Sequence, residues 1–186
     1  MAFQYSIRLC GAGGYGLIQA ARILAEAAAI YDNKNAAESC SYGPEARGSA
    51  SRAEIIISDE AIDYPKAKTI DFMVALTQQA YDKYRKDLNP NATAVVDSTV
   101  DLGNPGESWQ VYRVPFTEMA AKLDPQFPLI NMIALGFFAK VSSIISSTSI
   151  RQAILARIPK KSEEMYLKAF EIGLGAEAEI ISSINP

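Results

Sequence analysis

Four glycines lie within six residues near the start of the chain, in the stretch "GAGGYG", and they constrain its first unit of structure. An apolar stretch, residues 5–9, comes just before them, and residues 17–30 repeat apolar side chains at helical spacing. Glycine lets a strand turn sharply into a helix and leaves the backbone open to a ligand. The helix N-terminus adds free N–H groups and a positive dipole end, which favour an anion. We therefore predict a strand–turn–helix unit suited to an anion, built on Gly11, Gly13, Gly14 and Gly16.

The ligand of this turn is not fixed by the glycines alone. Their spacing fits the G-x-G-x-x-G pattern of dinucleotide-binding proteins, but the acidic residue expected about 20 positions later is poorly matched by Asp32 or Glu38. A P-loop is excluded because Leu17, not lysine, follows Gly16. Three interpretations stay open: a nicotinamide nucleotide, another phosphate-bearing ligand, or a tight turn that binds nothing.

The rest of the sequence predicts an α/β fold. Further strands are expected at residues 36–40, 49–58, 70–76, 93–98 and 108–114, and residues 89–92 are expected to form a turn. Helices are expected at 77–88, with Thr77 as N-cap, and at 117–123. From Pro128 onward the pattern is helical: Ser149 and Gln152 form a capping box, and a last helix extends to about Ile184. We expect one domain, residues 1–186: a three-layer α/β/α domain with a mostly parallel or mixed sheet and a helical C-terminal third.

Composition excludes several classes of function. The chain has no histidine, so it contains neither a Ser-His-Asp triad nor a His-ligated metal. Cys10 and Cys40 are too few for a typical iron–sulfur cluster, and we expect both to be small buried residues in a cytoplasmic protein. A net charge of −3 gives no electrostatic reason for nucleic-acid binding. The most apolar stretch, residues 129–145, is short for a membrane span and includes Lys140.

A second motif, "SYGPEARG" at residues 41–48, precedes the expected strand at 49–58. Loops that combine Gly, Pro and Arg often hold a rigid shape for a partner or an anion. Arg47 is the cation of this motif, and a guanidinium can pair bidentately with a phosphate. The alternative is a surface loop whose arginine is simply solvated.

Three motifs together resemble a known family. "GAGGYG", "SYGPEARG" and, later, "NMIALG" occur in the order found in the gamma subunit of 2-oxoacid:ferredoxin oxidoreductases. The resemblance runs over essentially the whole chain, and "SYGPEARG" points to the 2-oxoglutarate or branched-chain oxoacid type. Two positions depart from the family pattern: Ser49 stands where a glycine is usual, and Tyr15 where glutamine is frequent.

The resemblance implies a subunit of a complex that oxidises a 2-oxoacid with coenzyme A to acyl-CoA, carbon dioxide and reduced ferredoxin. Thiamine diphosphate and iron–sulfur clusters would lie on the alpha, beta and ferredoxin-like delta subunits, with ferredoxin as acceptor. The absence of any Asp-Gly dipeptide here agrees, because thiamine-diphosphate motifs open with Gly-Asp-Gly. This chain would supply no catalytic residue and no metal ligand, and would be inactive alone.

The resemblance also implies a role in assembly and in the coenzyme A region, and it assigns residues to each. Coenzyme A is expected at Gly11, Gly13, Gly14, Gly16, Arg47 and Gly48, and a subunit interface at Tyr42, Gly43, Pro44 and Asn131. Two alternatives remain: a stand-alone NAD(P)-binding reductase, and a purely structural assembly module.

Overall fold

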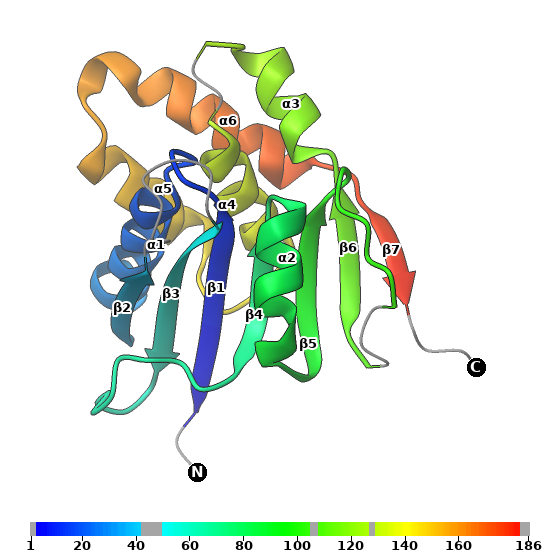
Figure 1. The fold of residues 1–186 in the computed structure, drawn as a ribbon. Helices are drawn as coiled ribbons and strands as arrows, with labels where there is room; N and C mark the ends of the chain where they lie inside the picture. The colour runs from blue at the N-terminus through cyan, green and yellow to red at the C-terminus, as the bar shows by residue number, and fades with distance from the viewer. Residues whose placement is uncertain (1–2, 42–49, 105–107, 127–128, 183–186) are drawn as a thin grey trace.

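A seven-stranded mixed sheet forms the centre of the protein (Figure 1). The computed structural model describes residues 3–41, 50–104, 108–126 and 129–182. The strand order is β2-β3-β1-β4-β5-β6-β7; β1, β4, β5 and β6 are parallel, and β2, β3 and β7 join by antiparallel pairing. The strands are β1 (Gln4–Ala12), β2 (Asn35–Ser41), β3 (Ala50–Ser58), β4 (Ile70–Ala75), β5 (Leu88–Asp97), β6 (Gln110–Val114) and β7 (Glu179–Ser182).

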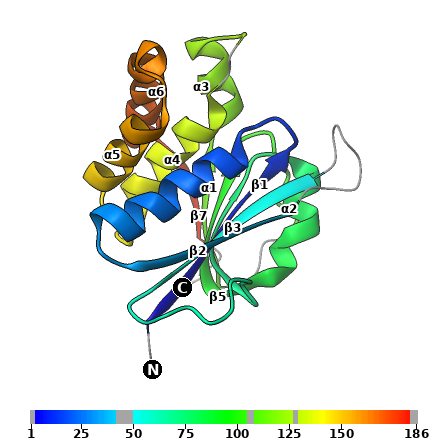
Figure 2. The ribbon, with the colours of Figure 1, turned by 90° about the vertical axis from the view of Figure 1, so that its left-hand side faces the viewer.

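Helices cover both faces of the sheet, which gives the three layers predicted from the sequence (Figure 2). On one face lies α2 (Gln78–Tyr84), with Thr77 as N-cap as predicted. The other face carries α1 (Leu17–Glu26), α3 (Phe116–Leu123), α4 (Ile130–Val141), α5 (Ser147–Arg157) and α6 (Glu163–Gly175). Side chains alternate along each strand, so Ile7 and Leu9 pack under α1 and α4 while Cys10 packs on the α2 side.

Helices α4 and α6 cross with their backbones in contact. A Cβ atom added to Gly136 would lie less than 3.0 Å from the carbonyl oxygen of Phe170, and one added to Gly173 would meet the backbone of Ile133. A glycine weakens a helix in general, but at position 173 the lack of a side chain lets α6 pack directly on α4.

The C-terminal prediction needs two corrections. The last helix does not extend to Ile184: α6 ends at Gly175, and residues 179–182 form β7, which pairs antiparallel with β6. The β-branched Ile180 and Ile181 suit a strand, and the open position beside β6 supplies the pairing partner. Helix α5 begins one turn before the predicted capping box, at Ser147, because the Ser146 hydroxyl accepts a hydrogen bond of 3.1 Å from the Ser149 N–H.

The turn predicted at residues 89–92 is also wrong, because β5 continues through it. The turn-forming residues are accommodated as a local irregularity: Asn91 has a φ of 66°, and the pairing with β4 shifts register between Ile70 and Phe72. Strand β6 pairs with β5 from Thr93 onward, so Pro90, which has no N–H, lies outside that ladder. Among the described residues, no helix combines the length and the apolar character needed to span a membrane.

Candidate functional site

The glycine-rich stretch forms the connection between β1 and α1, at the carboxyl end of β1, an interior strand of the sheet. We call residues 11–16 the glycine turn. Gly14 has a φ of 94° and Gly16 a φ of 70°, conformations that residues with a side chain rarely adopt. Gly16 is the N-cap of α1, and the Tyr15 N–H donates to the Ala12 carbonyl at 3.3 Å. The first-turn N–H groups of α1 have no partner within the helix, as at every helix start.

The glycines of the turn serve different purposes. A Cβ atom at Gly11 would lie 3.2 Å from the Leu76 side chain and 3.3 Å from that of Tyr15, so Gly11 allows close packing. A Cβ atom at Gly16 would collide with the Asn131 amide. A Cβ atom at Gly13 would meet no atom of the described residues within 4 Å. The space beside the Gly13 backbone is therefore unfilled, and the missing side chain would let a ligand approach the backbone closely.

Asn131, expected at a subunit interface, lies at the start of α4 against the glycine turn. Its side chain is 5% exposed, and its Nδ2 donates to the Gly16 carbonyl at 3.1 Å. The Ala20 N–H donates to the same oxygen at 3.0 Å. The Gly16 carbonyl is thus held by two donors from two helices, which fixes the direction of the first turn of α1.

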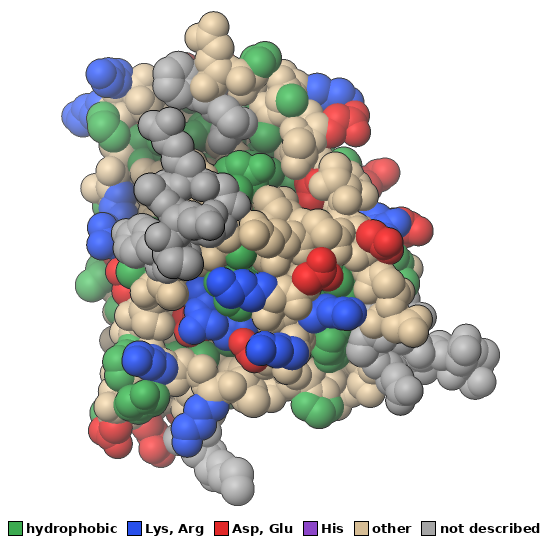
Figure 3. All heavy atoms as spheres, in the orientation of Figure 1, with side chains coloured by type: hydrophobic (Ala, Val, Ile, Leu, Met, Phe, Trp, Pro, Cys, Tyr) green, Lys and Arg blue, Asp and Glu red, His purple; other side chains and the backbone are tan. Residues whose placement is uncertain are grey.

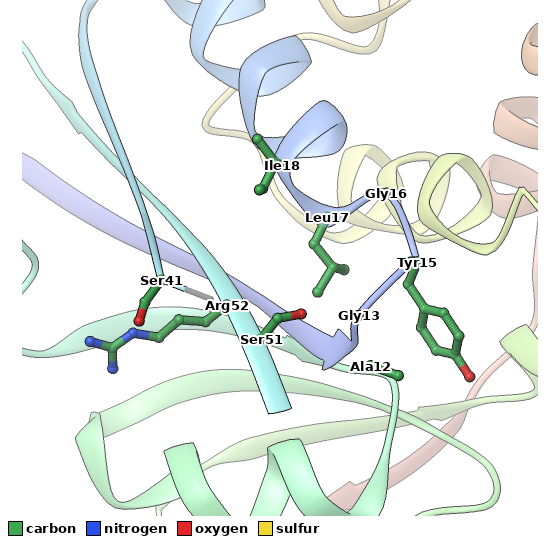
Figure 4. Close-up of a pocket in the computed structure, with 10 residues that line it drawn as sticks. Ala12, Gly13, Tyr15, Gly16, Leu17, Ile18, Ser41, Ser51 and Arg52 are labelled. Atoms are coloured by element: carbon green, nitrogen blue, oxygen red, sulfur yellow. The ribbon is translucent and has the colours of Figure 1, made fainter. Parts of the chain in front are cut away.

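A pocket of about 280 Å³ opens beside the turn (Figure 4). Helix α1 contributes Leu17 and Ile18 to its wall, and β3 contributes Ser51 and Arg52. Among the described residues that line it, Tyr15 and Arg52 are the only titratable ones. Such a site presents backbone N–H groups, hydroxyls and apolar surface, which suits binding of a ligand better than proton transfer.

Five predicted site residues, those at positions 42–44, 47 and 48, lie outside the described residues: Tyr42, Gly43, Pro44, Arg47 and Gly48. The chain leaves β2 at Ser41 and enters β3 at Ala50. Ser41 and Ser51 both line the pocket. Described residues on both sides of this segment, Ser41 and Ser51, therefore border the site.

Arg52 is a pocket residue that the sequence analysis missed. Its side chain extends sideways from β3, away from Gly13 and toward the side where Ser41 lies (Figure 4). Its Nε lies 3.4 Å from a Glu54 carboxylate oxygen, and its guanidinium lies 5.2 Å from the centre of the Tyr84 ring. The signal was present in the alternation of "SRAEI", which places Arg52 and Glu54 on one face of a strand that follows the predicted loop.

Glu54 is shared with a buried arginine of β1. Arg8, 2% exposed, donates to it at 2.6 and 2.9 Å, and also pairs with Asp87 at 2.6 Å. In the sheet Arg8 stands directly opposite Glu54, and Cys10 opposite Arg52. An ion network thus lies beneath the C-terminal end of α2, in which Arg8 and Glu54 are buried and Asp87 and Arg52 are partly exposed.

The two acidic residues considered for a nucleotide ribose have other partners. Asp32 accepts hydrogen bonds from the backbone and hydroxyl of Ser146 and from the Ser149 hydroxyl. Glu38 pairs with Arg22 at 3.2 Å. Neither residue lines the pocket. This arrangement disfavours the dinucleotide interpretation.

The cysteines differ from one another. Cys10 is buried as predicted, and burial raises the pKa of its thiol to about 12, so it carries no thiolate near neutral pH. Cys40 is exposed, so the prediction that both are buried is wrong for this residue. It lies on β2, an edge strand with a face open to solvent. In the described ranges, no group of three or more His, Cys, Asp or Glu side chains is placed to hold a metal.

Comparisons with known proteins give consistent relatives. The family model "Pyruvate ferredoxin/flavodoxin oxidoreductase" matches residues 6–176. The chain is 43% identical over 177 residues to the 2-oxoglutarate synthase subunit KorC of Methanocaldococcus jannaschii, covering 94% of each chain. It is also 40% identical to the gamma subunit of a keto/oxoacid ferredoxin oxidoreductase from Geobacter sulfurreducens. That crystal structure matches with a TM-score of 0.81 over 92% of this chain and 95% of the other.

A more distant structure shares the fold within a longer polypeptide. The 2-oxoglutarate:ferredoxin oxidoreductase from Magnetococcus marinus matches with a TM-score of 0.81 at 21% identity, over 92% of this chain and 30% of that one. That protein was solved with 2-oxoglutarate, coenzyme A and succinyl-CoA bound.

Proposed function

Since the chain belongs to the pyruvate ferredoxin/flavodoxin oxidoreductase family, we propose that it is the gamma subunit of a 2-oxoacid:ferredoxin oxidoreductase, with 2-oxoglutarate as the favoured oxoacid. The family model and these relatives confirm the family resemblance that three sequence motifs indicated. In such a complex, alpha and beta subunits and a ferredoxin-like subunit supply thiamine diphosphate and iron–sulfur clusters. The 2-oxoglutarate synthase subunits among the relatives support the choice of oxoacid.

We further propose that residues 1–186 act as one domain that contributes a phosphate-binding turn for coenzyme A. The observation that carries this proposal is the open space over Gly13, beside the N-terminus of α1 and within a pocket of about 280 Å³. Backbone N–H groups at a helix start bind phosphate oxygens, and a missing Cβ lets a diphosphate approach them closely. The coenzyme A bound to the Magnetococcus marinus protein supports the choice of ligand.

The two alternatives are disfavoured for different reasons. A stand-alone NAD(P)-dependent reductase needs an acidic or basic residue for the ribose, and Asp32 and Glu38 are turned to Ser146, Ser149 and Arg22 instead. A purely structural module gives no reason for a glycine at position 13, because a Cβ atom there would contact none of the described residues.

Reconstitution tests the proposal. The pure chain, supplied with 2-oxoglutarate, coenzyme A, thiamine diphosphate and a dye acceptor, should reduce no dye. The complex assembled with alpha, beta and ferredoxin-like subunits should reduce the dye in a coenzyme A-dependent reaction, and omission of this chain should abolish it. Steady dye reduction by the pure chain, or full activity without it, would contradict the proposed role.

A further inference from the structure

A second cavity adjoins the glycine-turn pocket and carries most of the charge of this region. It has a volume of about 290 Å³ and lies between β2, β3 and residues 66–67. Ser41 and Arg52 line both cavities, so the two hollows are neighbours along the same pair of strands. We call it the basic cavity.

The strand register builds this cavity. Ser41 of β2 stands directly opposite Arg52 of β3, and Ser39 stands opposite Glu54. Side chains at these paired positions share a face of the sheet, so two hydroxyls and a guanidinium line one wall. Lys66 lines the cavity from the segment between β3 and β4.

Arg52 is held in place but less tightly than its neighbour Arg8. Arg8 pairs with Glu54 and Asp87 at 2.6 Å each, whereas Arg52 lies 3.4 Å from Glu54 and 4.0 Å from Asp87. The Tyr84 ring lies beneath the Arg52 guanidinium, and Tyr84 itself donates to the Ala50 carbonyl at 3.1 Å. Arg52 is therefore oriented by its surroundings while keeping donors for a further anion.

The charges around the cavity leave an excess of positive charge. Among the charged residues that line the cavity, Arg52 and Lys66 are positive and Glu54 is negative, so the lining has a net charge of +1, and Arg8 pairs with the Glu54 carboxylate at 2.6 Å. Figure 3 shows Lys and Arg side chains gathered over β1, β3 and α2. The chain as a whole has a net charge of −3, so this local excess runs against the overall balance.

We propose that the basic cavity binds a second phosphate group of the ligand held at the glycine turn. The proposal rests on the proposed function, because it takes the diphosphate of coenzyme A to lie at the turn. It assigns the 3′-phosphate of the same molecule to Arg52 and Lys66, with the Ser41 hydroxyl as a further donor, since the Ser39 hydroxyl donates to Glu54 at 3.4 Å. A dianionic phosphate suits two cations and a hydroxyl.

The test compares coenzyme A with 3′-dephospho-coenzyme A in the assembled complex. The native complex should have a KM for the dephospho form at least about tenfold higher, the range of a charge-assisted hydrogen bond. Lys66→Gln should raise the KM for coenzyme A and leave that for the dephospho form unchanged, so the ratio falls toward one. Arg52→Gln, at a residue that also lines the glycine-turn pocket, should raise the KM for coenzyme A more than that for the dephospho form. Lys68→Gln is the matched control, because Lys68 is exposed, lies two residues away and does not line the basic cavity.

The outcomes separate this inference from the proposed function. A native complex that does not distinguish the two ligands, or variants that keep the native ratio, would overturn the inference. Lys66 is exposed, so Lys66→Gln still tests the inference even if Arg52→Gln disturbs the ion network. Gly13→Val acts on the diphosphate and should raise the KM for both ligands alike. A KM unchanged by Gly13→Val would instead count against coenzyme A at the turn.

Discussion

The side-chain amide of Asn131 donates a hydrogen bond to the carbonyl oxygen of Gly16, across 115 positions of sequence. Position 16 requires glycine for two separate reasons: its φ of 70° excludes most side chains, and a Cβ atom would collide with the Asn131 amide. The glycine turn is thus held from α4, and α4 in turn packs on α6 through Gly136 and Gly173. The geometry of the turn depends on the helical layer as much as on its own glycines.

Substitution by alanine should change the stability of the protein differently at Gly16 and at Gly13. Gly16→Ala should lower the free energy of unfolding by about 2 kcal/mol or more, because left-handed backbone costs about 1–2 kcal/mol and a steric clash is added. Gly13→Ala should change it by less than about 0.5 kcal/mol, because its Cβ atom enters open space. Urea denaturation of both variants measures the difference, and equal losses would contradict the assignment.

The crossing of α4 and α6 gives a second pair of variants. Gly136→Ala should lower the free energy of unfolding by about 3 kcal/mol or more, because its Cβ atom would overlap the backbone at Phe170. Gly175→Ala at the end of α6 is the control, since a Cβ atom there meets nothing within 4 Å. Thermal unfolding compares the two, and a stable Gly136→Ala protein would show that the helices do not pack in this way.

Removing one member of the ion network should lower the free energy of unfolding. Arg8→Met should destabilise the protein by about 3–5 kcal/mol, because Glu54 and Asp87 lose their closest partner. Adding Glu54→Gln removes the buried charge, so the double variant should recover part of this loss. Denaturation of the single and double variants tests the coupling. A double variant less stable than Arg8→Met would indicate that Glu54 is held mainly by other partners.

Asp32 should make stability depend on acidity. Burial raises the pKa of its carboxyl, but hydrogen bonds from Ser149 and Ser146 outweigh that effect and hold the pKa below its usual 3.8. A folded-state pKa below the unfolded value gives stability that is present above about pH 4 and is lost as the pH falls through the folded pKa. Melting temperatures from pH 6 to pH 2.5 should fall more steeply for the native chain than for Asp32→Asn. Parallel curves would refute this contribution.

The sequence predicted the parts of the fold that are determined by residues close together in the chain. The strand–turn–helix unit at Gly11–Gly16 and the N-cap at Thr77 follow from residues close together in the chain. Strand β7 could not be predicted in this way, because Ile180 and Ile181 become a strand only when the edge of β6 is available. Pro90 and Asn91 favour a turn locally but lie within β5, because the register shift against β4 between Ile70 and Phe72 accommodates them as an irregularity of the strand.

In the candidate site, too, local sequence identified some residues, and others are brought there only by the fold. The glycines were found because their backbone role is visible in the sequence, whereas Asn131 at the turn requires the fold that brings α4 to α1. The Gly-Pro-Arg motif of the loop predicted Arg47 as the cation of the site, whereas Arg52 belongs to the strand that follows it. Only the register of β2, β3 and β1 shows that Arg52 stands between Ser41 and Cys10 at the junction of two cavities.

Steady-state kinetics of the Gly13→Val complex test the central claim most directly. The valine side chain would fill the space in which the backbone is proposed to meet a diphosphate. Its Cβ atom would lie more than 4 Å from the other described residues, so the change should not disturb their packing. Gly175→Val is the control in α6. The account predicts a KM for coenzyme A raised at least about tenfold, with the KM for the 2-oxoacid unchanged. An unchanged KM for coenzyme A in a fully assembled Gly13→Val complex would contradict it.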